Sequence, residues 1–398
     1  MKVTMMGVLP PERSICHYCS HLAEEIAKLV NLEFYSFKNL FVNFSSDRIK
    51  KAKEEQLKKL SNMAVEYILI PYNPITWFQA GIKAEGEIVH VQHWAWYTGM
   101  IYSVILPIIR LRGKKIVITI HNVTPHMKNI FIRTIDSMFN KIIFSLSDAL
   151  IVHNERNKKR LFQLYKVKNK KVFIITHGFL KFGNNPEKIS KTKARCYLGI
   201  PRNRKVLLFF GYLWRYKGLD VLLKAMPKIR EKIRDVLLLV AGRPLPHWKE
   251  YVELIKKLNL EDCVKMKLGY LPDTELSYYI SASDICVFPY KEPFDTHGGA
   301  AALALSFRKP MIVTDIGGLP SYVKDKRCIV QPEDTDALSE AIVELLSNRE
   351  LLQKLEKDAD ELMDRLSWKN IARETVNTYI QIMDELSSYK EGDGDDDT

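Results

Sequence analysis

Two segments in the second half of this 398-residue chain combine cations and glycines in a way that suits a phosphate group. In residues 209–226 an apolar run ends at Gly211, and Arg215 and Lys217 stand in the next loop, just before Gly218 and an amphipathic stretch. Cations on a loop that leads into a helix N-terminus are well placed to bind an anion. A surface loop with incidental cations would look the same, so the residues alone leave both interpretations open.

The second segment, residues 287–323, places two glycine pairs directly after apolar runs. Gly298 and Gly299 precede an alanine-rich stretch, and Gly317 and Gly318 follow the next apolar run. Paired glycines before a helix present free backbone N–H groups and allow a ligand to approach the backbone closely. Two such turns after neighbouring strands indicate a binding site more strongly than one turn would.

Four histidines stand at or just after the ends of two apolar runs in the first half. His90 and His93 belong to the first run, and His121 and His126 follow the second. A lone histidine is most often structural, but four at the mouths of two adjacent strands point to a site.

The elements that must position these residues are short apolar runs that alternate with helical patterns. Six such runs occur in each half: 3–7, 66–71, 88–91, 115–120, 149–152 and 172–175, then 206–211, 236–241, 264–269, 285–289, 311–314 and 328–330. Apolar runs without alternation predict strands buried on both faces, and alternation with helices predicts parallel sheets. We therefore expect an α/β protein with two doubly wound, Rossmann-like domains that face each other across a ligand cleft.

The boundary between the two domains is expected in the glycine-, asparagine- and proline-containing segment that begins at residue 181. The sequence predicts a first domain over 1–180, completed by a C-terminal helix at about 372–388, and a second domain over 181–371. Residues 389–398 are expected to form a disordered acidic tail.

These segments resemble the family-4 glycosyltransferases of the group 1 type, which are retaining, nucleotide-sugar-dependent enzymes of GT-B fold. The resemblance covers nearly the whole chain. It rests on matches in the family's order and spacing at Gly211-Tyr212-Leu213, Lys217-Gly218, Gly269-Tyr270, Asp295 to Gly298, Lys309-Pro310, Thr314-Asp315, Gly317-Gly318-Leu319-Pro320 and Trp368. That order is far more specific than any single motif.

The resemblance implies a nucleotide-diphosphate sugar as the donor. With Arg215 and Lys217 present and no Asp-x-Asp metal signature in the sequence, no metal ion and no further cofactor are expected. The implied donor-binding residues are Arg215, Lys217, Gly269, Tyr270, Asp295, Thr296, His297, Gly298 and Gly299. Lys217 and Arg215 would neutralise the diphosphate as it leaves, and Asp295 would hold the sugar hydroxyls.

The resemblance also implies a histidine beside the transferred sugar, and His93 is favoured for it over His90 and Gln92. The predicted catalytic residues are therefore His93, Asp295 and Lys217. The predicted acceptor side consists of His90, His93, His121 and Asn122.

The chain departs from the family's pattern at several positions. Residues 12–15 replace a glycine-rich phosphate loop, Tyr212 replaces an arginine, Leu303 replaces a ribose-binding acid, and Ser321 replaces a glutamate. Two alternatives therefore stay open. One is a nucleotide-sugar epimerase of the same fold, and the other is a nucleotide-sugar-binding protein without catalytic activity.

The excess positive charge lies entirely in the first half of the chain. Residues 1–180 hold 26 Lys and Arg against 13 Asp and Glu, whereas the remaining residues hold 34 of each. A basic half beside a neutral half predicts an anionic or lipid-linked acceptor and a peripheral membrane contact as an option. Segment 129–146 could lie on a membrane or pack under the sheet. No nucleic-acid-binding signature is present, so nucleic acid is not expected as a partner.

The sequence also bears on the compartment. Its longest apolar stretch, 95–109, falls short of the roughly 20 residues that span a bilayer, and its start lacks the pattern of a signal peptide. The six cysteines are scattered, and the C-x-x-C of Cys16 and Cys19 has no second pair, which suits reduced thiols. We expect a cytoplasmic protein, with the inner face of the cell membrane as an additional location.

Overall fold

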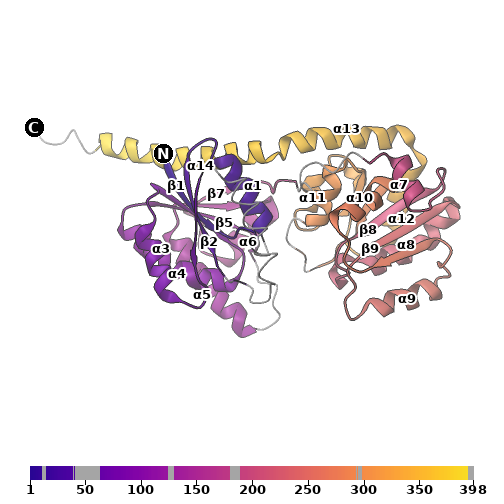
Figure 1. The fold of residues 1–398 in the computed structure, drawn as a ribbon, viewed down its shortest axis with the longest axis horizontal. Coiled ribbons are helices and arrows are strands. Elements are labelled where there is room, and N and C mark those ends of the chain that lie inside the picture. The colour runs from indigo at the N-terminus through magenta and orange to yellow at the C-terminus, as the bar shows by residue number, and fades with distance from the viewer. Residues whose placement is uncertain are drawn as a thin grey trace, which may run out of the picture. The chain divides into compact units, whose positions relative to one another are not determined.

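The computed structural model describes residues 1–10, 15–38, 40, 63–123, 130–179, 189–292, 294 and 298–392. The chain divides into two compact units (Figure 1). The first unit consists of Met1–Gly178 and Ser367–Thr398, and the second consists of Phe179–Leu366. Each unit is built on one parallel sheet, so the predicted α/β class with two doubly wound sheets is confirmed.

The sheet of the first unit has seven strands in the order β3-β2-β1-β4-β5-β6-β7. The strands are β1 (Lys2–Gly7), β2 (Asn31–Phe37), β3 (Ala64–Leu69), β4 (Ile88–His93), β5 (Lys115–Ile120), β6 (Ala149–Val152) and β7 (Lys171–Ile174). The order reverses between β1 and β4, and ligands of such sheets bind at the carboxyl ends of the strands beside this switch point.

The sequence predicts six strands in this half and misses β2. Glu33 and Ser36 interrupt its apolar residues, so no uninterrupted apolar run marks it. The polar groups are satisfied locally: Glu33 accepts hydrogen bonds from the Thr4 hydroxyl and the Glu85 amide, and Ser36 Oγ accepts one from the Leu9 amide. A buried strand can therefore carry polar side chains where its neighbours supply partners.

Helices cover both faces of this sheet (Figure 1). They are α1 (Cys16–Ile26), α3 (Pro74–Lys83), α4 (Trp96–Leu111), α5 (Ile130–Leu146), α6 (Glu155–Leu164) and α14 (Trp368–Gly392). Helices α1 and α14 pack together on one face, and α3, α4 and α5 pack side by side on the other. Helix α14 extends beyond the predicted range at both ends, so residues 389–392, predicted as part of the disordered tail, are helical.

The sheet of the second unit has six strands in the order β10-β9-β8-β11-β12-β13. They are β8 (Lys205–Phe210), β9 (Val236–Gly242), β10 (Val264–Leu268), β11 (Ile285–Phe288), β12 (Met311–Thr314) and β13 (Ile329–Val330), and all six coincide with predicted runs. The order reverses between β8 and β11, which makes the ends of these two strands the place to look for a ligand site.

Alternate side chains of β8 enter two different cores, as the period of a strand requires. Leu207 and Phe209 pack with α8 (Leu219–Lys232), α9 (Trp248–Lys257) and α12 (Thr335–Ser347). Leu208 and Phe210 pack on the other face, which is covered by α7 (Lys191–Tyr197), α10 (Asp273–Ala282), α11 (Gly299–Ser306) and α13 (Arg349–Arg365). Among the helices that the structure describes, none is long and apolar enough to cross a bilayer.

Candidate functional site

The loop after β8 carries a buried cation to the switch point of the second unit. Residues Arg215–Lys217 form a short 3-10 turn, and α8 begins directly afterwards. The Lys217 side chain is only 8% exposed, and no described residue accepts a hydrogen bond from its Nζ. Desolvation lowers its pKa to about 8, so the amine still carries its charge at neutral pH. An ammonium that is largely removed from water and has no protein acceptor has lost part of its hydration, and an anionic ligand would compensate for that loss.

Two glycines permit the close packing of this loop. Gly211 has φ +105°, and a Cβ at this position would lie 2.7 Å from Lys217 Nζ. Gly218 has φ +70°, and a Cβ there would lie 1.8 Å from the carbonyl oxygen of Pro289, at the end of β11. Larger residues would therefore displace either the lysine or the neighbouring loop.

The loop after β11 meets the lysine from the other side of the switch point. The Tyr290 ring centroid lies 5.6 Å from Lys217 Nζ, a distance at which an ammonium is attracted to an aromatic ring. Tyr290 is buried, and its hydroxyl has no hydrogen-bond partner among the described residues. The Thr314 hydroxyl, at the end of β12, donates to the Tyr290 carbonyl over 2.8 Å and so fixes this loop to the next strand.

Helix α11 begins at the same edge of the sheet. It starts at Gly299, and Gly298 precedes it with φ +70°. The N–H groups in the first turn of a helix have no partner within the helix and can bind an anion. Asp295, Thr296 and His297, which are predicted site residues, lie outside the described residues.

Leu303 lies on the inner face of α11, where it is buried in one of the two cores of the second unit. Its apolar side chain contributes to packing there and offers no polar group to a ligand.

The other predicted donor residues that the structure describes have different surroundings from Lys217. Arg215 is exposed and forms an ion pair with Glu250 of α9. Gly269 and Tyr270 follow β10, an edge strand that is separated from β8 by β9, and the Tyr270 side chain is exposed. A Cβ at Gly211 would lie 2.7 Å from Lys217 Nζ and 4.0 Å from the Ala300 Cβ, so the lysine lies beside the first turn of α11.

Sequence analysis missed Arg243, a second cation at this edge. It follows Gly242, the last residue of β9, and its guanidinium carbon lies 5.9 Å from the Tyr212 ring centroid. The signal was a Gly-Arg-Pro directly after an apolar run, which is the strand-end position that matters in a parallel sheet.

In the first unit, His90 fastens α14 to the sheet. Its Nδ1 lies 2.6 Å from the Tyr379 hydroxyl of α14, and its Nε2 lies 2.7 Å from Thr119 Oγ1 of β5. Burial lowers its pKa to about 3, so the ring is neutral. With both ring nitrogens engaged inside the unit, His90 serves the fold, and its predicted place on the acceptor side is not supported by this geometry.

His93 points to the opposite face of β4 from His90, toward α4 and α5. Its Nδ1 lies 2.9 Å from Thr98 Oγ1, its ring packs edge-on against Phe144, and only 1% of it is exposed. The prediction that His93 contacts the transferred sugar is not supported by this placement. The sequence puts His93 at the end of β4, but the alternation of side chains along the strand turns it under the sheet.

A chain of buried polar groups crosses the ends of β4, β5 and β6. His121 Nε2 lies 2.9 Å from Gln92 Oε1, and its Nδ1 lies 3.1 Å from His153 Nε2. His153 Nδ1 lies 2.9 Å from the Ile175 carbonyl, to which it must donate. Sequence analysis did not single out His153, although it directly follows the apolar run of β6.

Asn122 follows His121 in this region. Its Nδ2 donates to the Trp94 carbonyl over 2.8 Å, so it ties the loop after β5 to the end of β4. His126 lies outside the described residues.

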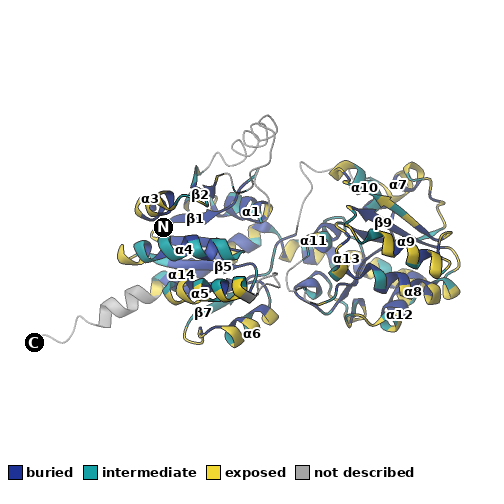
Figure 2. Cartoon of the chain, turned by 90° about the horizontal axis from the view of Figure 1, so that it is seen from below, coloured by how far each residue is buried: buried dark blue, intermediate teal, exposed yellow. Residues whose placement is uncertain are grey.

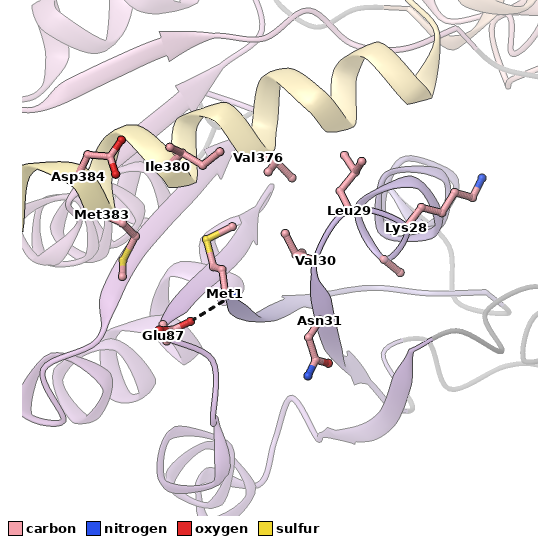
Figure 3. Close-up of a pocket in the computed structure, with 11 residues that line it drawn as sticks. Met1, Lys28, Leu29, Val30, Asn31, Glu87, Val376, Ile380, Met383 and Asp384 are labelled. Atoms are coloured by element: carbon pink, nitrogen blue, oxygen red, sulfur yellow. Dashed lines mark ion pairs between the residues drawn. The ribbon is translucent and has the colours of Figure 1, made fainter.

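A hollow of about 750 Å³ in the first unit lies at the amino-terminal ends of the strands. It is lined by Met1 and Leu29, near the amino-terminal ends of β1 and β2, and by Val376 and Ile380 of α14 (Figure 3). Ligands of doubly wound sheets bind at the carboxyl ends of strands, so we do not assign the donor to this hollow.

Comparison with known sequences finds a family-model match that lies within the second unit. Residues 190–362 match the family model described as Glycosyl transferases group 1. An uncharacterized glycosyltransferase of Methanocaldococcus jannaschii is 29% identical over 240 residues, which cover 58% of this chain and 60% of that protein. A D-inositol 3-phosphate glycosyltransferase of Corynebacterium urealyticum is 29% identical over 243 residues, which cover 58% of this chain and 56% of that protein. The chain thus matches less than two thirds of the length of these relatives.

Comparison with solved structures shows the fold. HepE from Anabaena in complex with UDP has a TM-score of 0.70 at 15% identity, over 96% of this chain and 100% of that chain. TarM has a TM-score of 0.65 at 11% identity, over 96% of this chain and 99% of that chain. The chain has the GT-B architecture of two Rossmann-like domains, as predicted.

Proposed function

We propose that this chain is a glycosyltransferase that transfers a sugar from a nucleotide-diphosphate sugar to an acceptor, with retention at the anomeric carbon and without a metal ion. The observation that carries the proposal is Lys217, a buried cation without a hydrogen-bond acceptor among the described residues, at the switch point of the sheet. The family match over residues 190–362 supports the reaction class. The neighbour with bound UDP supports the donor class.

In the proposed reaction, the bond between the anomeric carbon and the diphosphate oxygen breaks, and negative charge develops on the departing phosphate. Lys217 would stabilise that charge, assisted by the N–H groups at the start of α11. Arg215 could join after leaving its exposed ion pair with Glu250, which costs little. Preorganised cations perform the task that a divalent ion performs in other enzymes, and on this ground we propose a metal-independent reaction.

The acceptor hydroxyl oxygen bonds to the anomeric carbon on the face that the diphosphate leaves. Its proton passes to the departing phosphate oxygen, so the step is balanced without a protein nucleophile. Asp295 stays a prediction as the group that holds the sugar hydroxyls.

We further propose that the acceptor is anionic, either lipid-linked or a glycan, and binds the first unit. The argument is the charge of residues 1–180, which hold all of the chain's excess of 13 positive charges. The donor does not need this excess, because the residues after 180 are neutral overall.

A thermal-shift screen of UDP, GDP and ADP, with EDTA present and at constant ionic strength, tests the donor site. We expect one diphosphate to raise Tm, because a ligand that binds only the folded state stabilises it. Lys217→Ala should lose this shift but keep the Tm of the free protein. The matched control is Lys224→Ala, which removes an exposed lysine of α8 and should retain the full shift. Equal shifts in wild type and Lys217→Ala would show that the site is elsewhere.

Incubation of the matching nucleotide sugars with and without acceptor separates the proposed reaction from its alternatives. A glycosyltransferase consumes donor much faster with acceptor, an epimerase converts it without acceptor, and a binding protein does neither. The anomeric configuration of the product, measured by NMR, tests retention. In this assay Lys217→Ala should lower kcat/KM by roughly 100-fold.

A further inference from the structure

Helix α3 presents an apolar stripe to solvent. Ile75, Phe78 and Ile82 are 52–66% exposed and, at spacings of three and four residues, lie on one face of the helix. The opposite face packs into the unit through Trp77 and Ala80. A helix that covers a sheet normally turns polar residues outward, so this stripe is unusual.

Helix α5 repeats the pattern in the same layer. Phe131, Met138 and Ile142 are 39–69% exposed and share one face, while the buried face carries Ile143 and Phe144. Packing under the sheet, which the sequence left as one alternative for this segment, therefore occupies one side of α5. The other side remains an exposed apolar stripe.

Helix α4 lies between the two helices that carry these stripes. It packs between α3 and α5 (Figure 2): Ile108 lies against Gly81 of α3, and Gly99 lies against Phe139 of α5. Leu111, at the end of α4, is almost fully exposed. Single exposed apolar residues are ordinary, but a group of them across three neighbouring helices marks an interaction surface. We call the exposed apolar residues of α3, α4 and α5 the docking face.

The charges around the docking face are almost all positive. The three helices carry Lys83, Arg110, Arg133 and Lys141, and their single acid, Asp136, is buried. Lys83 and Arg110 form ion pairs with acids outside the helices, whereas Arg133 and Lys141 pair with no carboxylate among the described residues.

The sequence around these helices has the same bias. Residues 101–180 hold 15 Lys and Arg against 3 Asp and Glu, so 12 of the chain's 13 excess positive charges fall in this segment.

We propose that the docking face binds an anionic lipid surface. Its apolar side chains would enter the boundary between headgroups and acyl chains, and the surrounding cations would contact the anionic headgroups. A second copy of this chain fits less well, because a two-fold contact would bring Arg133 and Lys141 of both copies together without acids between them. The inference adds a membrane to the proposed function but does not depend on it.

Vesicle flotation without any nucleotide sugar tests the inference. The full chain should float with vesicles of phosphatidylcholine and phosphatidylglycerol and not with phosphatidylcholine alone, and it should detach as salt rises. Phe78→Ser/Phe131→Ser should lower the partition coefficient at least roughly tenfold, because the variant loses two aromatic side chains that would become buried in the membrane. Arg133→Glu/Lys141→Glu should lower it by a similar factor.

Two matched controls make the result specific. Leu29→Ser/Ile380→Ser removes exposed apolar residues of the same unit on the side of α1 and α14, and Lys224→Glu/Lys257→Glu reverses exposed lysines of the second unit. Both should bind like wild type.

Absence of wild-type binding to anionic vesicles, or equal losses in the controls, would overturn the proposal. So would a concentration-dependent dimer that the docking-face variants abolish, since it would assign the face to a second copy. The nucleotide screen is separate, so either proposal can fail alone.

Discussion

Two opposing effects act on the protonation state of the Lys217 amine. Burial favours the neutral amine and lowers the pKa to about 8, whereas a bound diphosphate would favour the charged form. The protonated state is the one that can stabilise a leaving phosphate. In the free enzyme, therefore, raising the pH through about 8 removes the charge on which the proposed reaction depends.

We predict that kcat/KM falls as pH rises above about 8, because kcat/KM reports on groups of the free enzyme. Lys217→Arg should have a lower maximal rate but no loss up to pH ~10, since an arginine stays protonated there. The measurement is the pH profile of kcat/KM for both proteins. If both profiles fall together, the alkaline loss belongs to another group.

Metal independence is a second prediction at this scale. Extensive treatment with EDTA should leave transfer unchanged, because Lys217 and the α11 N-terminus supply the stabilising charge. The check is transfer activity before and after chelation and after re-addition of Mg²⁺ or Mn²⁺. Complete loss with EDTA and recovery with metal would contradict the proposed site.

Individual site residues were only partly predictable. The position of Lys217 after a strand and before a helix indicated a phosphate site, and the structure places it at the switch point. The strand end that carries His93 was predicted correctly, but not the face of the strand, which depends on how β4 lies between its helices. Arg243 and His153 also directly follow strands, and only Arg243 has a local signal, the Gly-Arg-Pro after its strand.

At the scale of elements, the second unit followed closely from its uninterrupted apolar runs. The missed strand β2 lies in the first unit, where Glu33 and Ser36 are stabilised by partners distant in sequence. Such contacts join residues that are distant in sequence, so they cannot be predicted from a local sequence pattern. The docking face was predictable only in part: the sequence left a membrane surface open for segment 129–146, whereas the apolar residues of α3 fit either a buried or an exposed helix face until their neighbours are known.

The connection between β8 and α8 yields a prediction about an element. Gly218→Ala should destabilise the second unit by roughly 3 kcal/mol, since it adds a clash with the Pro289 carbonyl to the strain of a positive φ. Gly199→Ala is the matched control, because Gly199 also has a positive φ, +61°, but has open space around its Cβ position. It should cost about 1 kcal/mol. Urea unfolding of both variants measures the difference, and equal losses would show that the contact with Pro289 can relax.

At the scale of the whole molecule, the two units differ in how they respond to acid. The four buried histidines among the described residues all lie in the first unit; they are His90, His93, His121 and His153. Burial holds the pKa values of His90 and His153 at about 3 and that of His93 at about 4, and it lowers the pKa of His121 as well. The folded unit therefore keeps these rings neutral at pH values where an unfolded chain would protonate them.

The sign of the effect follows from proton binding. Below the ordinary histidine pKa of about 6.5, the unfolded first unit binds more protons than the folded one, so its stability falls as pH falls. Each ring contributes about 1.4 kcal/mol per pH unit between about 6.5 and its folded pKa. Asp136 acts in the opposite direction, because burial raises its pKa to about 6, but it is one group against five, since burial also lowers the pKa of His177 to about 4.

We therefore predict that the first unit unfolds at a lower temperature than the second when pH is lowered from about 7.5 to about 5, and that its midpoint shifts far more than that of the second unit. Hydrogen exchange with mass spectrometry assigns each transition to its unit. Asp136→Asn should enlarge the shift of the first unit, since it removes the one opposing group while keeping an acceptor for the Asn140 amide. The second unit serves as the internal control. Equal acid shifts in both units would mean that the buried histidines titrate without unfolding, and the polar chain from Gln92 to Ile175 would then have to accommodate a charge.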